Sequence, residues 1–405
     1  MKKKCNICGN NFAKLFNLGN HPCADTFYNS QLKAKNAIKK PLVVGYCTCH
    51  HLSSITNISG FDRYKKYDYS YTSGNSPIAI NHFKEISNII KKKFIKNKKC
   101  QLLEIASNDG TFLKNFNHNK KINIVGIDPS KYMCKLAKKN KINNIINDFF
   151  NYKSSIKIKK KYGDFDLIYA ANVFNHIDNP YEFLENSKNL IKKNGIIILE
   201  FPDLDQLLKK ISFDTIYHEH RNYYSKRSLI KVLRNVNLKI IKFENLEYMS
   251  GSLRVYLINQ KFTKTDCTKF QKFNLQLFNK FINKSKFIKK YLKKFVKKHK
   301  YKNIVGVGAA TKGNTLLNYC GFNYKQINCI LEKSIHKIGK FTPSSAIPIV
   351  SENKPFKIDA LLFLPWNINS FLKKKFLNKF KVDYISLEDI VKNYYDKNKK
   401  IKNKS

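Results

Sequence analysis

The chain has 405 residues, of which 42% are hydrophobic and 26% are charged. This composition is globular, and the length is sufficient for about two or three domains with buried cores. No run approaches ~18 consecutive apolar residues, which argues against a membrane span, and no apolar signal-peptide core follows Met1–Lys4. We therefore expect a cytoplasmic protein without a membrane partner.

The formal net charge of +49 arises from 77 Lys and Arg residues against 28 Asp and Glu residues. The arginines are Arg63, Arg221, Arg227, Arg234 and Arg254. Proteins that read bases or clamp phosphates usually use the forked guanidinium group of Arg. Here Lys is spread along the chain beside abundant Asn and Ile, as in an AT-rich coding sequence. We expect no nucleic-acid partner, and an RNA methyltransferase or nucleic-acid-binding protein is the alternative class that the charge suggests.

Two pairs of metal-ligating residues lie in the first 66 residues. Zinc in structural sites takes four N or S ligands in a tetrahedron, and two close pairs from separate loops supply them. The predicted ligands of a structural zinc ion are Cys5, Cys8, Cys47 and His50. Cys49 or His51 could replace His50, and reduced structural thiols without a metal are the alternative.

A parallel α/β domain is predicted at about 80–260, where helical patterns alternate with short apolar runs. Its first strand, at 101–106, leads into a turn at 107–110. The small residues of such a turn let the backbone approach a ligand. A degenerate form of the D/E-x-G-x-G-x-G turn of class I methyltransferases is given by Glu104, Ala106, Asn108 and Gly110.

Polar residues also follow the next strands. Asp128 ends a strand at 122–127 and suits hydrogen bonds to both ribose hydroxyls. Asp148 precedes two Phe residues, which fits an adenine edge with an aromatic neighbour, and Asn172 follows a strand at 165–171. This ordered series predicts S-adenosylmethionine (SAM) as the cofactor, with a dinucleotide as the alternative.

The densest cluster of titratable groups contains Tyr217-His-Glu-His220. The pKa of His lies near the pH at which a general base works best, Tyr can relay a proton, and Glu can orient an imidazole. We interpret the segment as an acid–base cluster, and histidines buried in the core or at a helix cap are the alternative. The Tyr-rich run at 67–73 could form one wall of a sugar pocket, or a surface loop.

The last third of the chain predicts a connecting helix and a second lobe. The helix is expected over 266–299, with apolar residues at helical spacing at Phe270, Phe273, Leu277 and Phe281. Residues 300–395 restart a strand–turn–helix pattern and predict a smaller α/β lobe. Its turn leads into a helix that carries Lys312 and Asn314, where backbone N–H groups and the lysine suit a phosphate of the substrate. Tight packing of the strand on the helix is the alternative.

Together these motifs resemble the nucleotide-sugar C-methyltransferases of deoxysugar biosynthesis, the family of the tetronitrose C-3 methyltransferase. The resemblance is carried by Cys5-x-x-Cys8 with Cys47-x-x-His50, Glu104–Leu113, Tyr217–His220, Gly306–Cys320, Gly339–Pro343, Ile347–Pro348 and Trp366–Asn367. It implies a zinc-binding module at 1–66, a Rossmann-like SAM methyltransferase domain at 67–262 and a C-terminal, Rossmann-like α/β lobe at 263–405. His50 departs from the family pattern, because it stands in a usual Cys position.

The resemblance also assigns roles. It implies that His220 is the general base, that Tyr217 is a proton relay or alternative base with Glu219 as their partner, and that Tyr69 or Tyr71 lines the sugar site. The implied reaction is methyl transfer from SAM to a carbon next to the ketone, expected to be C-3, of a nucleoside-diphosphate 4-keto-6-deoxysugar, through an enolate. N- or O-methylation of a nucleotide-linked sugar is the alternative. Zinc is implied as structural, and a monomer is expected.

Overall fold

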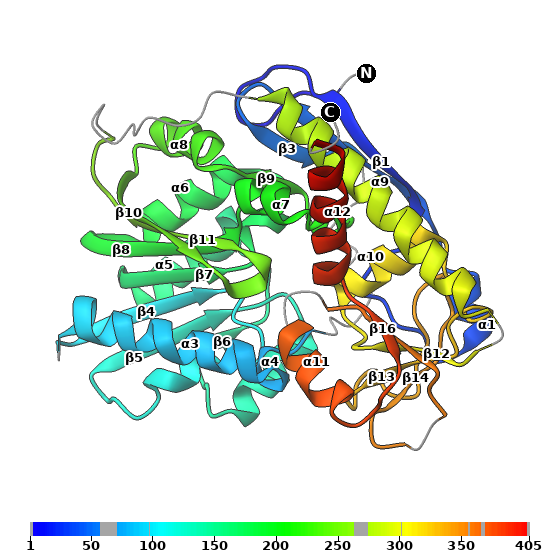
Figure 1. Ribbon diagram of the computed structural model, residues 1–405. Helices are drawn as coiled ribbons and strands as arrows, with labels where there is room; N and C mark the ends of the chain where they lie inside the picture. The colour runs from blue at the N-terminus through cyan, green and yellow to red at the C-terminus, as the bar shows by residue number, and fades with distance from the viewer. Residues whose placement is uncertain are drawn as a thin grey trace.

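The computed structural model describes residues 3–56, 71–96, 98–262, 274–300, 302–354, 357–365 and 369–402. Across these residues the chain forms three sheets, of four, seven and five strands (Figure 1). The mixed α/β fold with a Rossmann-like central domain and an N-terminal cysteine cluster is the one predicted. None of the described helices is both long enough and apolar enough to cross a membrane.

The seven-stranded sheet has the order β10-β11-β8-β7-β4-β5-β6. Its parallel part consists of β4 (Cys100–Ile105), β5 (Ile122–Ile127), β6 (Ile145–Ile146), β7 (Phe165–Ala171) and β8 (Ile191–Pro202). The antiparallel hairpin of β10 (Lys239–Leu246) and β11 (Ser252–Ile258) joins it at β8. The strands predicted at 122–127 and 165–171 are confirmed.

Both faces of this sheet are covered. Successive residues of β4, such as Leu102 and Leu103, belong to two different buried clusters, because successive side chains of a strand point to opposite faces. One face packs against α3 (Pro77–Ile90) and α4 (Lys131–Lys139), and the other against α5 (Tyr152–Tyr162), α6 (Pro180–Leu190) and α8 (Lys226–Asn235). Burial on both faces explains why the strands are almost continuously apolar.

Local sequence sets where these helices begin. The side chain of Ser76 accepts the N–H of Ala79 and Pro77 follows as the first residue of α3, while Asn179 and Pro180 open α6 in the same way. A polar cap followed by Pro is favoured because Pro lacks the N–H that the first turn leaves unpaired. These starts position the loops at the carboxyl edge of the sheet.

The four-stranded sheet is antiparallel and has the order β1-β2-β3-β9. Its first three strands are β1 (Ala13–His21), β2 (Lys40–Cys47) and β3 (His51–Ser54), whereas β9 (Asn222–Tyr224) comes from the central part of the chain. A short helix, α1 (Gln31–Lys35), lies between β1 and β2. The N-terminal sheet therefore incorporates a strand that directly follows the Tyr-His-Glu-His segment, which the sequence did not predict.

The C-terminal sheet is entirely parallel, with the order β14-β13-β12-β15-β16. It comprises β12 (Ile304–Val307), β13 (Cys329–Glu332), β14 (Ile349–Ser351), β15 (Ala360–Phe363) and β16 (Asp383–Ile385), with α10 (Thr311–Cys320), α11 (Asn369–Leu377) and α12 (Leu387–Lys402). The order reverses between β12 and β15, as in doubly wound nucleotide-binding folds. This confirms the smaller α/β lobe.

The helix α9 (Leu275–Lys298) connects the lobes and lies beside β1 and α12 in Figure 1. Its buried face carries Phe278, Phe281, Ile288, Leu292 and Val296, in one core with residues of β1, α7 (Leu204–Lys210) and the C-terminal lobe. Of the four apolar positions predicted, Phe270 and Phe273 lie outside the described residues, Phe281 is buried and Leu277 is exposed. A shared core makes the lobes parts of one packed body.

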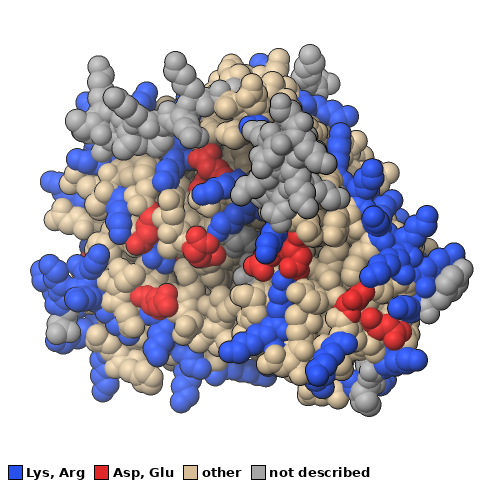
Figure 2. Space-filling view, viewed as in Figure 1, with Lys and Arg blue, Asp and Glu red and all other residues tan. Residues whose placement is uncertain are grey.

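Lys and Arg side chains are scattered over the whole face shown in Figure 2, with a few acidic side chains between them. Two of the arginines are buried in ion pairs: Arg221 with Asp178 at 2.9 Å and Arg254 with Glu200 at 2.5 Å. These arginines therefore serve internal pairing rather than phosphate binding at the surface.

Candidate functional site

Four thiols meet at the end of the N-terminal sheet. The Sγ atoms of Cys5, Cys8, Cys47 and Cys49 all lie within 4.8 Å of one another. Sγ of Cys5 is 3.7 Å from that of Cys49, and Sγ of Cys8 is 3.2 Å from that of Cys47. A four-thiolate set suits tetrahedral zinc, and its burial leaves no open position for a substrate.

The structure places Cys49, one of the alternatives, where His50 was predicted. His50 has a left-handed backbone, with φ 63°, and this turn directs its ring away from the thiols. Its Nε2 lies 3.5 Å from Oδ1 of Asp205, and its ring meets Phe278 edge-on. Nδ1 of His51 is 3.5 Å from Sγ of Cys5, so His51 borders the cluster. The prediction of His50 is therefore corrected to Cys49.

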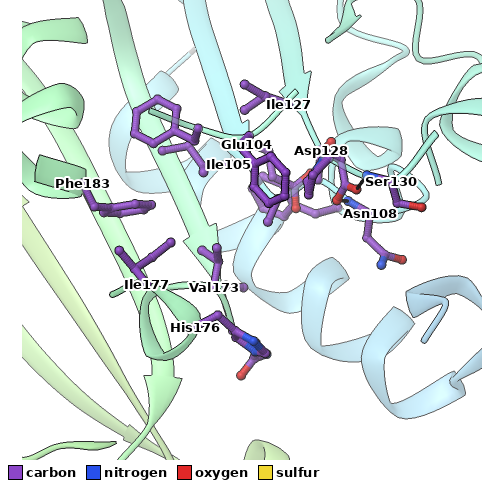
Figure 3. A pocket seen from close by; sticks show the side chains of 18 of the residues that line it. Glu104, Ile105, Asn108, Ile127, Asp128, Ser130, Val173, His176, Ile177 and Phe183 are labelled. Atoms are coloured by element: carbon purple, nitrogen blue, oxygen red, sulfur yellow. Dashed lines mark hydrogen bonds between the residues drawn. The ribbon is translucent and has the colours of Figure 1, made fainter. Parts of the chain in front are cut away.

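A cavity of about 440 Å³ opens at the carboxyl edge of the central sheet, where β4, β5 and β7 end. Figure 3 shows Glu104, Asn108, Asp128 and His176 around it. Five of the predicted cofactor-binding residues line it: Glu104, Ala106, Asn108, Asp128 and Asn172. In open α/β sheets ligands bind at this edge, next to the point where the strand order reverses.

The turn after β4 is shaped by three residues with positive φ: Ala106 (59°), Asn108 (51°) and Gly110 (77°). Gly110 does not line the cavity. A Cβ atom there would lie 2.8 Å from Cγ1 of Ile142, so the glycine permits close packing of the turn. The sequence pattern thus identified the turn, but Gly110 packs against Ile142 and does not face the cavity.

The acidic groups of the cavity differ in what they already bind. Both carboxylate oxygens of Asp128 accept backbone N–H groups, from Asn108 at 2.9 Å and from Ser130 at 2.8 Å, and burial raises its pKa to about 6. Glu104 is 4% exposed, and its Oε2 has no hydrogen-bond partner among the described residues. Burial and the charges of Asp109 and Asp128 raise the pKa of Glu104 well above its ordinary value. A buried carboxylate with an open acceptor fits a cationic ligand such as SAM.

Asp148 does not line the cavity, although its neighbours Phe149 and Phe150 do. Its Oδ1 accepts the N–H of Phe149 at 2.8 Å, so the carboxylate is turned back onto its own loop. The geometry gives Asp148 the role of shaping the loop that presents these two rings, which corrects the expectation that its side chain lines the cofactor site.

The Tyr-His-Glu-His segment is buried between the central domain and the other two lobes. Nδ1 of His220 lies 2.8 Å from the carbonyl oxygen of Thr215. Because a carbonyl oxygen can only accept, Nδ1 carries the hydrogen and Nε2 of the neutral ring is left as the acceptor. Burial, the nearby His176 and Lys312 lower the pKa of His220 well below 6.5. The ring of Tyr217 lies 3.9 Å from that of His220, centroid to centroid.

His176 links this cluster to the cavity. Its ring is perpendicular to that of His220, with the centroids 4.8 Å apart, and it also lines the cavity. His220 itself does not line the cavity. His176 was not among the predicted site residues. Its position just after the strand at 165–171 was a usable signal, because polar residues at this sheet edge face the ligand.

Glu219 faces the N-terminal module. Its Oε1 accepts the N–H of Asp25 at 3.3 Å, and its charge acts on the neighbouring His218, opposing the burial that lowers the pKa of that histidine. The role of Glu219 as the partner of Tyr217 and His220 stays a prediction. Its contact explains why the segment is buried: Asp25 brings the N-terminal loop against it.

Of the predicted substrate residues that the structure describes, one lines the cavity and two make contacts between lobes. Tyr71 lines the cavity, and Tyr69 lies outside the described residues. Nζ of Lys312 donates to the carbonyl of Met249 at 3.2 Å, near the charge of Asp214. Asn314 is 1% exposed and donates to the carbonyl of Ala24 at 2.6 Å, so its side chain joins the C-terminal lobe to the N-terminal module.

The turn between β12 and α10 is occupied by two carboxylates. Oε2 of Glu332 accepts the N–H of Ala309 at 2.8 Å, and Oδ1 of the buried Asp25 accepts Oγ1 of Thr311 at 2.7 Å. A phosphate at these groups would meet negative charge, so the structure does not favour the predicted phosphate position at this turn. Lys312, which is half-buried, stays a predicted substrate residue.

Comparison with known proteins agrees with this geometry. Residues 79–242 match the methyltransferase domain family, and residues 250–381 match the C-methyltransferase C-terminal domain. The chain is 24% identical to C-methyltransferase NovU of Streptomyces niveus over 379 residues, 90% of each protein. It is 27% identical over 192 residues to the ubiquinone biosynthesis O-methyltransferase of Pelagibacter ubique (strain HTCC1062), which covers 43% of this chain and 77% of the relative. The protein is thus a SAM-dependent methyltransferase that carries the C-terminal domain of the C-methyltransferases.

Proposed function

We propose that this enzyme methylates the carbon next to the ketone, C-3, of a nucleoside-diphosphate 4-keto-6-deoxysugar. The C-terminal domain match and the full-length similarity to a C-methyltransferase support carbon as the acceptor. A carbon next to a ketone is acidic enough to lose its proton to a positioned base. The enzyme therefore needs a neutral base in a dry site beside the cofactor cavity.

The observation that carries the proposal is the state of His220. Its Nδ1–H donates to the carbonyl of Thr215, which fixes the tautomer and leaves Nε2 able to accept a proton. The depressed pKa keeps the ring neutral near pH 7. Tyr217, whose ring centroid lies 3.9 Å from that of His220, supplies a hydroxyl that can relay the proton. His176 stands between this base and the cavity.

The remaining residues hold the reactants and the developing charge. SAM supplies an electrophilic methyl group when bound. Glu104, Asn108 and Asp128 would hold it, and removal of the substrate proton leaves an enolate oxygen that needs hydrogen-bond donors. Asn172 and Tyr71 line the same cavity and offer such donors. The thiolates of Cys5, Cys8, Cys47 and Cys49 would hold a structural zinc ion that fixes the N-terminal module.

The first test is methyl transfer in D₂O. The enzyme is incubated with SAM and a panel of nucleoside-diphosphate 4-keto-6-deoxysugars, and mass spectrometry and proton NMR locate the new methyl group and any deuterium. A carbon-bound methyl group beside the ketone, with enzyme-dependent exchange at that position, is expected. Methylation of N or O without exchange would favour the alternative reaction. No turnover by an enzyme that binds SAM would contradict the proposed substrate class.

Two histidine variants then test the base. His220→Gln is expected to lower kcat by roughly 10²–10⁴ while SAM affinity is retained, since general-base catalysis contributes about that much. His218→Gln is the matched control, because His218 is also buried but its Nε2 contacts the carbonyl of His21. Near-normal turnover by a folded His220→Gln enzyme would refute the assignment of the base.

A further inference from the structure

The segment 174–183 forms one wall of the cofactor cavity. It contains η4 (Phe174–His176) and the start of α6. The residues of this segment that line the cavity are 176–179, Glu182 and Phe183. The ring centroid of His176 also lies 4.8 Å from that of His220. A displacement of the segment would therefore change both the cofactor site and the approach to the Tyr-His-Glu-His cluster.

The Cys5–Cys8 knuckle contacts this wall directly. The side chain of Asn6 donates to the carbonyl of Asp178 at 2.8 Å. The hydroxyl of Tyr181 donates to the carbonyl of Ile7, also at 2.8 Å. Two ligands of one ion would fix the backbone between them, and both residues of that backbone are bonded to the wall.

A row of stacked rings joins the thiols to the same wall. Nδ1 of His51 is 3.5 Å from Sγ of Cys5, and the His51 ring stacks on Tyr224 with centroids 5.2 Å apart and planes inclined by 15°. Tyr224 in turn stacks on Phe174, with centroids 4.7 Å apart and planes inclined by 26°. All three rings are fully buried. Because a buried core is close-packed, a shift of the first ring is passed on to the last.

Arg221 adds a third connection between the N-terminal sheet and the wall. Its Nε pairs with Oδ1 of Asp178 at 2.9 Å, and its backbone N–H donates to the carbonyl of Asn175 at 2.8 Å. Its own carbonyl accepts the N–H of Ser54 and Oγ of Ser53 from β3, each at 3.0 Å. The residue that follows the Tyr-His-Glu-His segment therefore bonds to both the module and the wall.

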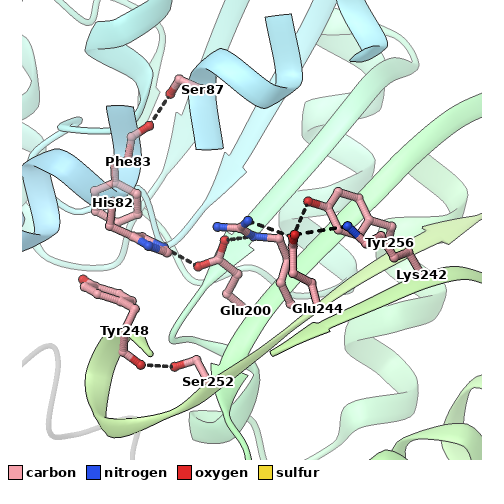
Figure 4. Close-up of polar contacts among 10 residues, drawn as sticks. His82, Phe83, Ser87, Glu200, Lys242, Glu244, Tyr248, Ser252 and Tyr256 are labelled. Carbon is pink, nitrogen blue, oxygen red and sulfur yellow. Dashed lines mark hydrogen bonds and ion pairs between the residues drawn. The ribbon is translucent and has the colours of Figure 1, made fainter. Parts of the chain in front are cut away.

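Another part of the cavity wall is held within the central domain. Tyr248 lines the cavity from the hairpin between β10 and β11, and its ring lies flat on the imidazole of His82, with centroids 3.8 Å apart. Figure 4 shows how His82 is held in turn: its Nε2 is 2.6 Å from Oε2 of Glu200, and Oε1 of Glu200 is 2.5 Å from Nε of Arg254. These groups come from α3, β8 and the hairpin, whereas the segment 174–183 is held from the N-terminal module as well.

We propose that the cysteine knuckle, through Asn6, Ile7 and His51, holds the wall at 174–183 in the form that binds SAM. A zinc ion on the four thiolates would supply the constraint that fixes the knuckle. The inference rests on the proposed function only for this ion, and it needs neither the sugar nor the assignment of the base. It gives the N-terminal module a task in cofactor binding, beyond the stability of its own fold.

The first test is SAM affinity, measured by calorimetry, in variants that keep all four thiols. Asn6→Ala removes the bond to Asp178 and is expected to weaken SAM binding by about twofold, and the double variant with Tyr181→Phe by about fivefold or more. Asn10→Ala is the matched control, because Asn10 is also exposed but its Nδ2 contacts Oγ1 of Thr48 within the module. The zinc content, measured by elemental analysis, is expected to be unchanged in all of these variants.

The position of the wall can be followed at His176 by NMR. Its imidazole resonances are assigned by their loss in His176→Gln, and they are expected to shift in the double variant and to stay unchanged in Asn10→Ala. His299, at the end of α9, is the internal reference. Equal shifts at His176 and His299 would show a general loosening of the protein and would contradict a specific effect on the wall.

Zinc affinity gives the converse measurement. Saturating SAM is expected to raise the affinity for zinc, measured by competition with a chelator, by the same factor by which zinc raises the affinity for SAM. This gain is expected to disappear in the double variant. No effect of SAM on zinc affinity would refute the role of the metal.

Unchanged SAM affinity and unchanged His176 resonances in the double variant would overturn the inference. If the double variant does not fold, Asn6→Ala decides the question, since it changes an exposed side chain. Failure to methylate any sugar would refute the proposed substrate but would leave the SAM and zinc affinities decisive for the knuckle.

Discussion

Arg254→Met is expected to destabilise the protein far more than the loss of one ion pair at the surface. The substitution keeps most of the side-chain volume and leaves Glu200, 1% exposed, with His82 as its remaining partner. Burial raises the pKa of Glu200, but the hydrogen bonds and charges of His82 and Arg254 outweigh burial and lower it overall. Removing one partner of a buried pair costs about 3–5 kcal/mol, because the other charge stays buried without compensation.

The measurement is urea unfolding of the wild type, Arg254→Met, Glu200→Gln and the double variant. Lys192→Met is the control, because Lys192 is 47% exposed and pairs with Asp166 at 2.9 Å, and such a surface pair contributes about 0–1 kcal/mol. The double variant is expected to recover part of the loss, since it removes the orphaned charge. Equal losses for Arg254→Met and Lys192→Met would refute the reasoning.

Three further predictions concern metal, cofactor and pH. Cys49→Ser is expected to lose zinc, measured by elemental analysis, and to have a lower Tm. His50→Gln is expected to keep the metal, because the four clustered ligand atoms are all cysteine thiols. Zinc loss in both variants would contradict the four-cysteine site. Glu104→Gln is expected to weaken SAM binding, measured by calorimetry, by about tenfold or more, since it removes a buried carboxyl group that can ionise beside a cationic ligand; unchanged affinity would contradict that role. Burial lowers the pKa of His21 to about 4. Between about pH 6.5 and about pH 4 the imidazole is therefore protonated in the unfolded chain but neutral in the folded protein. The free energy of unfolding is expected to fall by about 3 kcal/mol over this range because of this histidine. The difference between wild-type and His21→Gln unfolding curves measures this loss, and a pH-independent difference would contradict it.

The strands and the cofactor turn were predictable from the sequence because their signals are local. Runs such as 122–127 and 165–171 are apolar on both faces, and the polar residue that ends each run lies at the same sheet edge. Glu104, Asn108, Asp128 and Asn172 could therefore be assigned to one cofactor site from the sequence, and all four line the cavity.

The remaining parts of the site depend on contacts between segments far apart in the chain. Spacing alone could not choose between Cys49 and His50, because the left-handed backbone at His50 decides which side chain faces the thiols. The structure does not favour the phosphate predicted at the turn before α10, because the hydroxyl of Thr311 already donates to Asp25, about 290 residues away in the chain. Tyr248 reaches the cavity through a hairpin whose sequence carries no ligand-binding motif.

The pairing of β9 with β3 sets an order for folding during synthesis. Strand β3 (His51–Ser54) pairs with β9 (Asn222–Tyr224) and is an edge strand until β9 is present, so the first sheet cannot be completed until some 170 further residues have been made. Until then the unpaired N–H and C=O groups of this edge are a template for pairing with another chain. A fragment that ends near residue 66 would keep that edge open, and we expect it to aggregate where the full chain does not. The boundary between the N-terminal and central regions is therefore a poor place to cut this enzyme or to exchange modules with a relative.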